Sequence, residues 1–356
     1  MTLRDSCRDQ RILPASATKA LSMAAGLLLG LTVAAQTAQA AASGLRYTPD
    51  THGVVPIPAG ERQLQTVVAE PYFKVSDKAL QLEGPAFDRE GNLYFVEVFG
   101  GSVMKLTKDK KLSTVLPKNA YGSAGLAVHK DGRIFMAGLG NFKDTGVVVA
   151  FNPDGGQLQT IIPASAGYLP DDLVFDAEGG FYFTDFKGTS TQPTGGVYHV
   201  SPDFKTITPL MPNMAVPNGV ALSPNGKVLW ADEFSNGRLH RVELANATTI
   251  APFGTTVTYQ FQGHAPDSMR TDRDGNVYVA MYQQGRVLVF NDNGLPIGQI
   301  LLPGREKGHN LRSTSLAFVP GTNEVLIVTN DADRGQGSTI YRAKGFAPGV
   351  QLFSHQ

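Results

Sequence analysis

Four oxygen-donor side chains occupy one recurring position in the sequence, each immediately before a short apolar segment. They are Glu83, Asp171, Asn218 and Asp267. Carboxylate and amide oxygens are the ligands that hard divalent cations prefer, and a set without Cys or His favours Ca²⁺ or Mg²⁺ over Zn²⁺. Three carboxylates brought together would repel one another unless a cation compensated them. The pattern predicts a divalent metal site, with Ca²⁺ as the preferred ion and Mg²⁺, Mn²⁺ or Zn²⁺ as alternatives.

Taken one at a time, these residues have simpler interpretations. An Asn-Gly pair is typical of a turn, an Asp-Asp pair of a solvated loop, and an Asp-Ser pair of an Asx turn. The hypothesis of a site depends on their joint recurrence, because four of six equivalent positions carry an oxygen donor suited to a hard cation. Ala124 and Thr314 occupy the other two positions.

Six copies of one unit must position these side chains. Each copy has a four-residue apolar opening, a polar turn rich in Asp, Gly and Asn, and a second alternating strand. The copies begin at residues 84, 125, 172, 219, 268 and 315, so successive starts differ by 41, 47, 47, 49 and 47 residues. This period accommodates four short strands and is typical of propeller blades. The tight turns predict that the first two strands of each unit pair antiparallel.

The repeat predicts an all-β fold, a six-bladed β-propeller over residues 64–356 with a metal site in the central channel. The innermost strand of each blade runs along that channel, so equivalent repeat positions lie at the same height and the four oxygen donors should converge. The last copy has room for only three strands. We therefore expect the segment 64–73, which precedes the first copy, to complete the sixth blade.

Residues 1–40 have the pattern of a signal peptide. Basic residues precede the apolar run 20–35, and the small-residue pattern Ala38-Gln39-Ala40 follows it. A membrane anchor is the alternative, but the run is shorter than the roughly 20 residues that a spanning helix needs. The expected location is periplasmic or secreted. Cleavage would remove Cys7, the only cysteine. Residues 41–63 are expected to form an extended lead-in.

The composition indicates a chain with a large core and excludes two classes of partner. Hydrophobic residues make up 42% of the 356 residues, and the chain has 31 basic and 31 acidic residues. This balance offers no electrostatic footprint for nucleic acid or for an anionic membrane. We expect a monomer that has no nucleic-acid partner and no membrane contact after signal cleavage.

Over roughly residues 80–350, the sequence resembles the SMP-30/gluconolactonase/LRE-like family of six-bladed propellers, and within it the bacterial drug-responsive lactonases. The segments that carry the resemblance are 82–101, 171–188, 195–204, 217–223, 266–268, 276–291 and 298–314. The resemblance implies hydrolysis of small lactones, with the same four oxygen donors as calcium ligands. It also implies that Asp267 takes part in proton transfer and that Ser268 lies beside the metal or the substrate.

The drug-responsive lactonases also carry a second, structural calcium in the second and third blades. Asp144 and Gly146 are the candidate residues for that site in this sequence. The segment 162–170 lacks the acid and hydroxyl ligands that such a site would use, so the second metal site is doubtful.

The chemistry implied is metal-assisted ester hydrolysis. A cation would bind the lactone carbonyl oxygen and lower the pKa of a water molecule, and Asp267 would position that water for proton transfer. There is no G-x-S-x-G elbow that would mark a serine nucleophile. The candidate residues of the substrate pocket are His264, Arg270, Tyr282 and His309.

Two alternative functions are compatible with the same residues. A paraoxonase-like esterase of broader scope would use the same metal and the same ligands. A propeller without catalytic activity that binds a periplasmic ligand or protein is the alternative from another class, since fold alone does not determine function.

Overall fold

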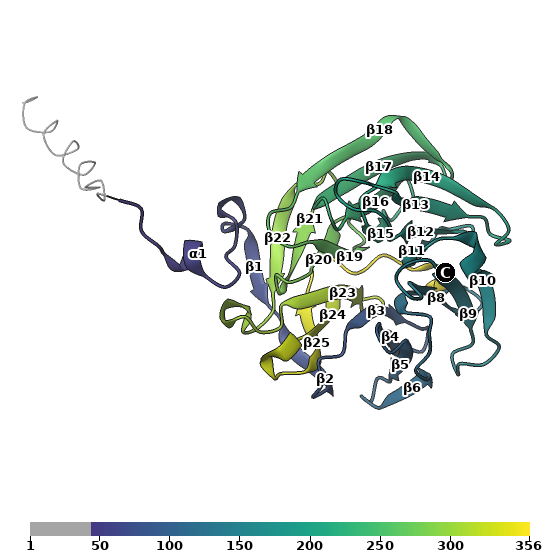
Figure 1. Cartoon of the computed structure of the whole chain (residues 1–356), viewed down its shortest axis with the longest axis horizontal. Coiled ribbons are helices and arrows are strands. Elements are labelled where there is room, and N and C mark those ends of the chain that lie inside the picture. Colours follow the sequence, from purple (N-terminus) through teal and green to yellow (C-terminus); the bar gives the residue numbers. More distant parts are fainter. Residues whose placement is uncertain (1–43) are drawn as a thin grey trace, which may run out of the picture. The chain divides into compact units, whose positions relative to one another are not determined.

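The computed structural model describes residues 44–356, so the predicted signal peptide and Cys7 lie outside the described residues. The chain divides into two units, and the second, Pro49–Gln356, contains all the strands that the structure describes. These strands form six sheets arranged as the blades of a propeller around a central channel (Figure 1). The predicted six-bladed β-propeller is confirmed.

Each blade consists of strands ordered outward from the channel. Blade 1 contains β3 (Leu82–Phe87), β4 (Leu93–Glu97), β5 (Ser102–Leu106) and β6 (Leu112–Leu116). Blade 2 contains β7 (Ser123–Val128), β8 (Ile134–Gly138), β9 (Val147–Phe151) and β10 (Gln159–Ile162). Blade 3 contains β11 (Pro170–Phe175), β12 (Phe181–Asp185), β13 (Gly195–Val200) and β14 (Ile207–Met214).

The other three blades follow the same order. Blade 4 contains β15 (Pro217–Leu222), β16 (Val228–Glu233), β17 (Arg238–Asn246) and β18 (Thr249–Gln260). Blade 5 contains β19 (Pro266–Thr271), β20 (Val277–Met281), β21 (Arg286–Phe290), β22 (Pro296–Leu301) and β1 (Gln65–Val68). Blade 6 contains β23 (Arg312–Phe318), β24 (Glu324–Asn330), β25 (Ser338–Lys344) and β2 (Glu70–Ser76).

The helical elements are short and lie between or outside the blades. They are α1 (Pro49–His52), η1 (Ala59–Glu61), η2 (Ala164–Ala166), η3 (Arg305–Lys307), η4 (Ala332–Arg334) and η5 (Phe353–His355). None of the helices in the described part of the chain is both long and apolar enough to cross a membrane.

The first two strands of every blade pair antiparallel, as the turn residues predict. Each innermost strand begins two or three residues before the predicted start of its repeat. Each also carries a shift of register near that beginning, where extra residues on the inner strand face the second strand. Such a bulge bends the strand and redirects side chains. All six bulges lie at the height of the predicted metal ligands.

The N-terminal strand segment closes the ring in a way that differs from the prediction. The segment 64–73 was expected to form one strand that completes the sixth blade. Its second half does so, because β2 pairs antiparallel with β25. Its first half, β1, instead pairs parallel with β22 of blade 5. The chain crosses between the two blades at Ala69, which is buried, and therefore ties blade 5 to blade 6.

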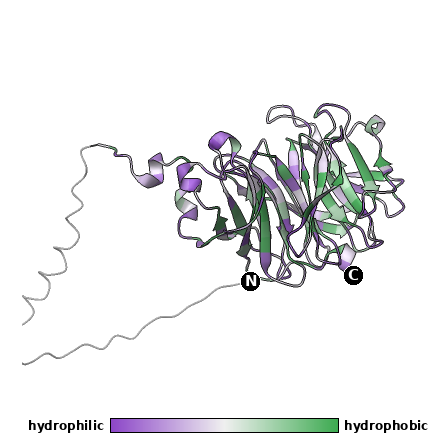
Figure 2. Cartoon of the chain, turned by 90° about the horizontal axis from the view of Figure 1, so that it is seen from below, coloured by the Kyte–Doolittle hydropathy of each residue, from purple (hydrophilic) through white to green (hydrophobic). Residues whose placement is uncertain are grey.

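The hydrophobic core lies between neighbouring blades. There is one large cluster of buried apolar residues at each of the six blade interfaces. Both faces of a blade are therefore covered, which explains why the strands are apolar on both sides. Figure 2 shows this distribution, with hydrophobic residues gathered on the strands and hydrophilic residues on the connecting loops.

A buried ion pair holds the lead-in against blade 5. The predicted extended segment contains two helical turns, α1 and η1, and Glu61 at the end of η1 is only 2% exposed. Its carboxylate lies 2.5 Å from Arg286 Nη1, and Tyr259 Oη donates to Glu61 Oε1 at 2.5 Å. Gln299 Nε2 donates to the Glu61 carbonyl oxygen. The lead-in therefore contributes a charged group to the interior of the propeller.

Replacing Glu61 tests how strongly this contact stabilises the ring. Glu61→Ala leaves the guanidinium of Arg286 buried without its partner, and we expect the free energy of unfolding to fall by about 3–5 kcal/mol. Urea denaturation measures this change. The matched control is Glu70→Ala, whose pair with Arg342 is solvent-exposed and should contribute about 1 kcal/mol or less. Equal effects of the two substitutions would contradict a structural role for Glu61.

Candidate metal centre and substrate pocket

The four predicted ligands occupy the same place in four blades. Each is the second residue of an innermost strand: Glu83 in β3, Asp171 in β11, Asn218 in β15 and Asp267 in β19. All four are buried, with relative exposures of 5–7%. They lie near the end of the channel at which the inner strands begin, which we call the N-terminal mouth.

The inner strands approach one another closely at this height. Ser268 Oγ, in blade 5, donates a hydrogen bond to Glu83 Oε1, in blade 1, at 3.0 Å. A Cβ added at Gly219 would lie 2.6 Å from the carbonyl oxygen of Asp267, so only glycine can follow Asn218. Gly84, which follows Glu83, has a φ of 59° and faces the carbonyl oxygen of Ala124 in the same way. The side chain of Glu83 therefore extends toward the other inner strands.

The buried carboxyl groups influence one another electrostatically. Burial raises the pKa of Glu83 to about 7, and the charge of Asp172 contributes to the increase. Burial and then the charge of Glu83 raise the pKa values of Asp171 and Asp267 well above their usual range. Each of these groups disfavours ionisation of the others, as expected for like charges that share a desolvated space. The structure therefore brings the three carboxylates into one electrostatic cluster.

Two further carboxylates belong to this cluster. Asp172 follows Asp171 within the bulge of β11, and Asp232 lies on β16 opposite the bulge at Asn218 and Gly219. Both are at most 1% exposed. Burial raises the pKa of Asp232, and the charge of Asp172 adds to that increase. Sequence reasoning missed Asp232, although an aspartate inside the apolar strand 228–233 is a recognisable anomaly.

Two buried oxygens test whether a cation fits this site. Asn218 Oδ1 and Asp232 Oδ2 are buried, and neither accepts a hydrogen bond from the described residues. A buried acceptor without a donor is costly, and a cation would satisfy it. Within residues 44–356, however, no three Asp, Glu, His or Cys side chains have the mutual spacing of a preformed metal site. The donor set thus fits a hard cation in chemistry, whereas its side chains are not drawn together to coordination distances.

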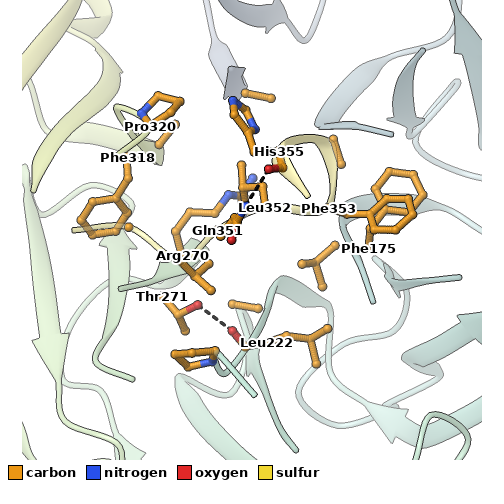
Figure 3. Close-up of a pocket in the computed structure, with 18 of the residues that line it drawn as sticks. Phe175, Leu222, Arg270, Thr271, Phe318, Pro320, Gln351, Leu352, Phe353 and His355 are labelled. Atoms are coloured by element: carbon orange, nitrogen blue, oxygen red, sulfur yellow. Dashed lines mark hydrogen bonds between the residues drawn. The ribbon is translucent and has the colours of Figure 1, made fainter. Parts of the chain in front are cut away.

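Arg270 lies apart from the other three candidate pocket residues. It is the fifth residue of β19, beyond the carboxylates, and its guanidinium pairs with Asp172 at 2.8 Å. It lines a cavity of about 770 Å³ at the opposite, C-terminal mouth of the channel (Figure 3). The C-terminal segment 348–356 lies across this mouth, where Leu352 and Phe353 help to line the cavity. The structure therefore separates Arg270 from the other candidate pocket residues, and its contact with a substrate stays a prediction.

The other three predicted pocket residues lie near the N-terminal mouth. Tyr282 directly follows β20. Burial raises the pKa of its phenol, and the charges of Asp267 and Glu83 raise it further. The phenol therefore lies beside the cluster. His309 Nδ1 lies 3.1 Å from the carboxylate of Asp331, the residue that follows β24. His264 is exposed in the loop that leads into β19.

Two aromatic residues that the sequence analysis missed, Phe186 and Phe234, join Tyr282 at the N-terminal mouth. Phe186, Phe234 and Tyr282 each follow the second strand of a blade, and each backbone N–H donates at 2.9 Å to the residue just before the inner strand. The ring centroids of Phe186 and Phe234 lie 5.9 Å apart, as do those of Phe234 and Tyr282. We call these three residues the aromatic rim. An alignment of the six copies would have revealed these residues, because each occupies the position directly after the second strand of its blade.

The doubtful second metal site is not shown by the structure. Asp144 is exposed, and its carboxylate accepts a hydrogen bond from Asn141 Nδ2 at 2.8 Å. Gly146 is packed against the backbone of residues 168–169, where a Cβ would lie 2.3 Å from the Tyr168 carbonyl oxygen. These contacts account for Asp144 and Gly146 as parts of a loop.

Comparisons with known proteins agree with this architecture. Residues 82–330 match the model of the SMP-30/Gluconolactonase/LRE-like region. The chain is 52% identical over 318 residues to lactonase drp35 of Staphylococcus haemolyticus, covering 88% of this chain and 98% of that protein. It is 51% identical to lactonase drp35 of Staphylococcus aureus strain USA300, over 88% of this chain and 97% of that protein.

Solved structures share the fold at lower sequence identity. Regucalcin from Agrobacterium tumefaciens, described as a calcium-binding protein, has a TM-score of 0.65 and 18% identity, covering 81% of this chain and 99% of that chain. A gluconolactonase from Xanthomonas campestris has a TM-score of 0.63 and 18% identity, covering 79% and 96%. The residues that the family model matches span the inner strands that carry the carboxylate cluster. The chain therefore belongs to the SMP-30/gluconolactonase/LRE-like family.

Proposed function

We propose that this protein is a metal-dependent lactonase that hydrolyses a small lactone at the N-terminal mouth of the channel. The observation that carries the proposal is the cluster of buried, mutually repelling carboxylates beside the unpaired amide oxygen of Asn218. The lactonases to which the chain is about half identical support the reaction type. Glu83, Asp171, Asn218 and Asp267 would hold the cation, and Ca²⁺ suits their all-oxygen chemistry.

The bound cation would supply a positive charge that polarises the lactone carbonyl and stabilises the negative charge that develops on its oxygen. Asp267 orients the attacking water and accepts its proton as the new C–O bond forms. The same proton then passes to the ring oxygen as the ester bond breaks, so the product is a hydroxy acid. Ser268, held by its hydrogen bond to Glu83, keeps that carboxylate directed toward the cluster.

The aromatic rim favours a lactone with an apolar body. Phe186, Phe234 and Tyr282 are partly exposed, and they offer ring faces next to the carboxylates. A flat apolar ring would bury surface against them, whereas the hydroxyl groups of a sugar lactone would lose hydrogen bonds to water that the aromatic rings would not replace.

Substitution of the proposed base and of one ligand tests the mechanism. Asp267→Asn should lower kcat by roughly 10²-fold or more, because it removes proton transfer and one carboxylate ligand. Glu83→Gln should weaken metal binding, and excess metal should restore part of its activity. Hydrolysis of a lactone panel, before and after chelation, measures both effects. Asp144→Asn is the matched control and should retain activity.

Undiminished hydrolysis after metal removal, or in both substituted proteins, would rule out this mechanism. Metal binding without hydrolysis of any lactone in the panel would favour a binding protein over an enzyme.

The raised carboxyl pKa values predict how metal binding depends on pH. In the metal-free protein Glu83 holds a proton that the unfolded chain has already released, so its contribution to stability should fall as the pH rises from about 4.5 through about 7. A cation binds the ionised carboxylates and should offset this loss. We therefore expect Ca²⁺ to raise the melting temperature more at pH 8 than at pH 5, as measured by calorimetry. Glu83→Gln, which cannot ionise, should show a smaller difference, and an equal increase at both pH values would contradict the prediction.

Replacing one residue of the aromatic rim tests the substrate class. Phe234→Ala should raise KM for an aromatic lactone by roughly tenfold, since it removes a partly buried ring face, and should leave KM for a sugar lactone almost unchanged. Steady-state kinetics with both substrates measure the effect. Phe346→Ala, an exposed phenylalanine in the loop after β25, is the control. A parallel change for both lactones would argue against a role of the rim in selectivity.

A further inference from the structure

The carboxylate cluster contains one internal ion pair. Arg270 Nη1 lies 2.8 Å from Asp172 Oδ2, and Nη2 lies 3.3 Å from Asp172 Oδ1. The Asp172 side chain is 1% exposed and that of Arg270 is 15% exposed. Two parallel N–H donors facing two carboxylate oxygens form the bidentate geometry that arginine provides and lysine does not. This contact is therefore a specific, desolvated pair rather than a surface interaction.

The pair spans three consecutive inner strands. Asp172 belongs to β11 and Arg270 to β19, while Val220 of β15, between them, directs its backbone N–H toward Asp172 Oδ2 at 3.4 Å. Arg270 Nη1 also donates to the carbonyl oxygen of Met269 at 2.6 Å. The guanidinium is thus held both by its own strand and by Asp172 of β11, and it lines the cavity at the C-terminal mouth (Figure 3).

Asp172 lies next to the predicted ligands. It directly follows Asp171 in the bulge of β11, and the backbone N–H that points toward its Oδ2 belongs to Val220, two residues after Asn218. Among the residues that the structure describes, Arg270 is the only lysine or arginine that forms an ion pair with any of the five clustered carboxylates. Within residues 44–356, Arg270 thus compensates one of the five carboxylates, Asp172.

We propose that Arg270 sets the metal affinity of the site by neutralising Asp172, so that the charge of Asp172 does not act on the cation. This inference rests on the proposed function. Arg270 and Asp172 are positioning residues that do not touch the substrate. The pair limits how strongly the channel attracts a divalent ion, and it fixes Asp171, the neighbour of Asp172, in the bulge of β11.

The proposal makes the two single substitutions act in opposite directions. Arg270→Gln leaves the negative charge of Asp172 unopposed, so Ca²⁺ should bind more tightly, by roughly tenfold. Asp172→Asn leaves the positive charge of Arg270 unopposed, so Ca²⁺ should bind more weakly by a similar factor. The double variant with both substitutions removes both charges and leaves an uncharged polar side chain at each position, and its affinity should return to within about threefold of the parent protein.

Isothermal titration of the purified protein with Ca²⁺ alone measures these affinities and needs no substrate. Arg273→Gln is the matched control, because Arg273 also lines the cavity at the C-terminal mouth, is exposed, and has no ion pair within residues 44–356. It should leave the dissociation constant unchanged. Opposite shifts in the two single variants, with recovery in the double variant, would support the proposal.

Other outcomes separate this inference from the proposed function. If the parent protein binds Ca²⁺ and both single substitutions weaken binding, the pair is only structural and the inference is overturned, while the proposed function stands. If Asp172→Asn and the double variant lose binding alike, Asp172 is itself a ligand and the inference is equally overturned. Absence of Ca²⁺ binding in the parent protein would remove the metal site and this inference together. Should a single variant fail to fold, parental affinity in the double variant supports the proposal, and a loss beyond tenfold overturns it.

Discussion

Mutual repulsion among carboxylates that are buried in one channel is the constraint on which the rest of this structure depends. Burial removes water from Glu83, Asp171 and Asp267, and each charge makes ionisation of the others less favourable. A folded chain keeps such an arrangement only when the surrounding structure stabilises it by a larger amount. The cluster is therefore a cost to stability, which the cation of the proposed function would offset.

The ring of blades supplies the stabilisation. Six apolar interfaces hold the inner strands, and the N-terminal segment ties blade 5 to blade 6 through β1 and β2. Glycines at 84 and 219 let neighbouring strands approach within distances that no other residue would permit. Because the strands cannot separate without breaking these interfaces, the carboxylates cannot relax away from one another. Rigid β-structure is thus used to hold charges that would disperse in a more flexible fold.

The two ends of the channel differ in chemistry. The N-terminal mouth combines aromatic rings with carboxylates; under the proposed function, the rings would contact the lactone and the carboxylates would hold the cation. At the C-terminal mouth, the segment 348–356 covers an apolar cavity, and Arg270 separates this cavity from the cluster. One inner strand, β19, contributes to both ends: Asp267 near its beginning and Arg270 further along. The position of a residue along its inner strand thus decides at which end of the channel the residue lies.

The sequence by itself determined the number of blades and the height at which Glu83, Asp171, Asn218 and Asp267 lie, because a repeat with a constant period maps equivalent residues to equivalent places. It did not determine what each side chain meets. Asp232 joins the cluster from a second strand because a bulge on β15 brings it opposite Asn218, and Arg270 turns toward Asp172, two blades away. The division of the segment 64–73 between two blades likewise depends on which edge strand is left open when the ring closes. These contacts join residues far apart in the chain, and no local pattern encodes them, so only the tertiary structure decided them.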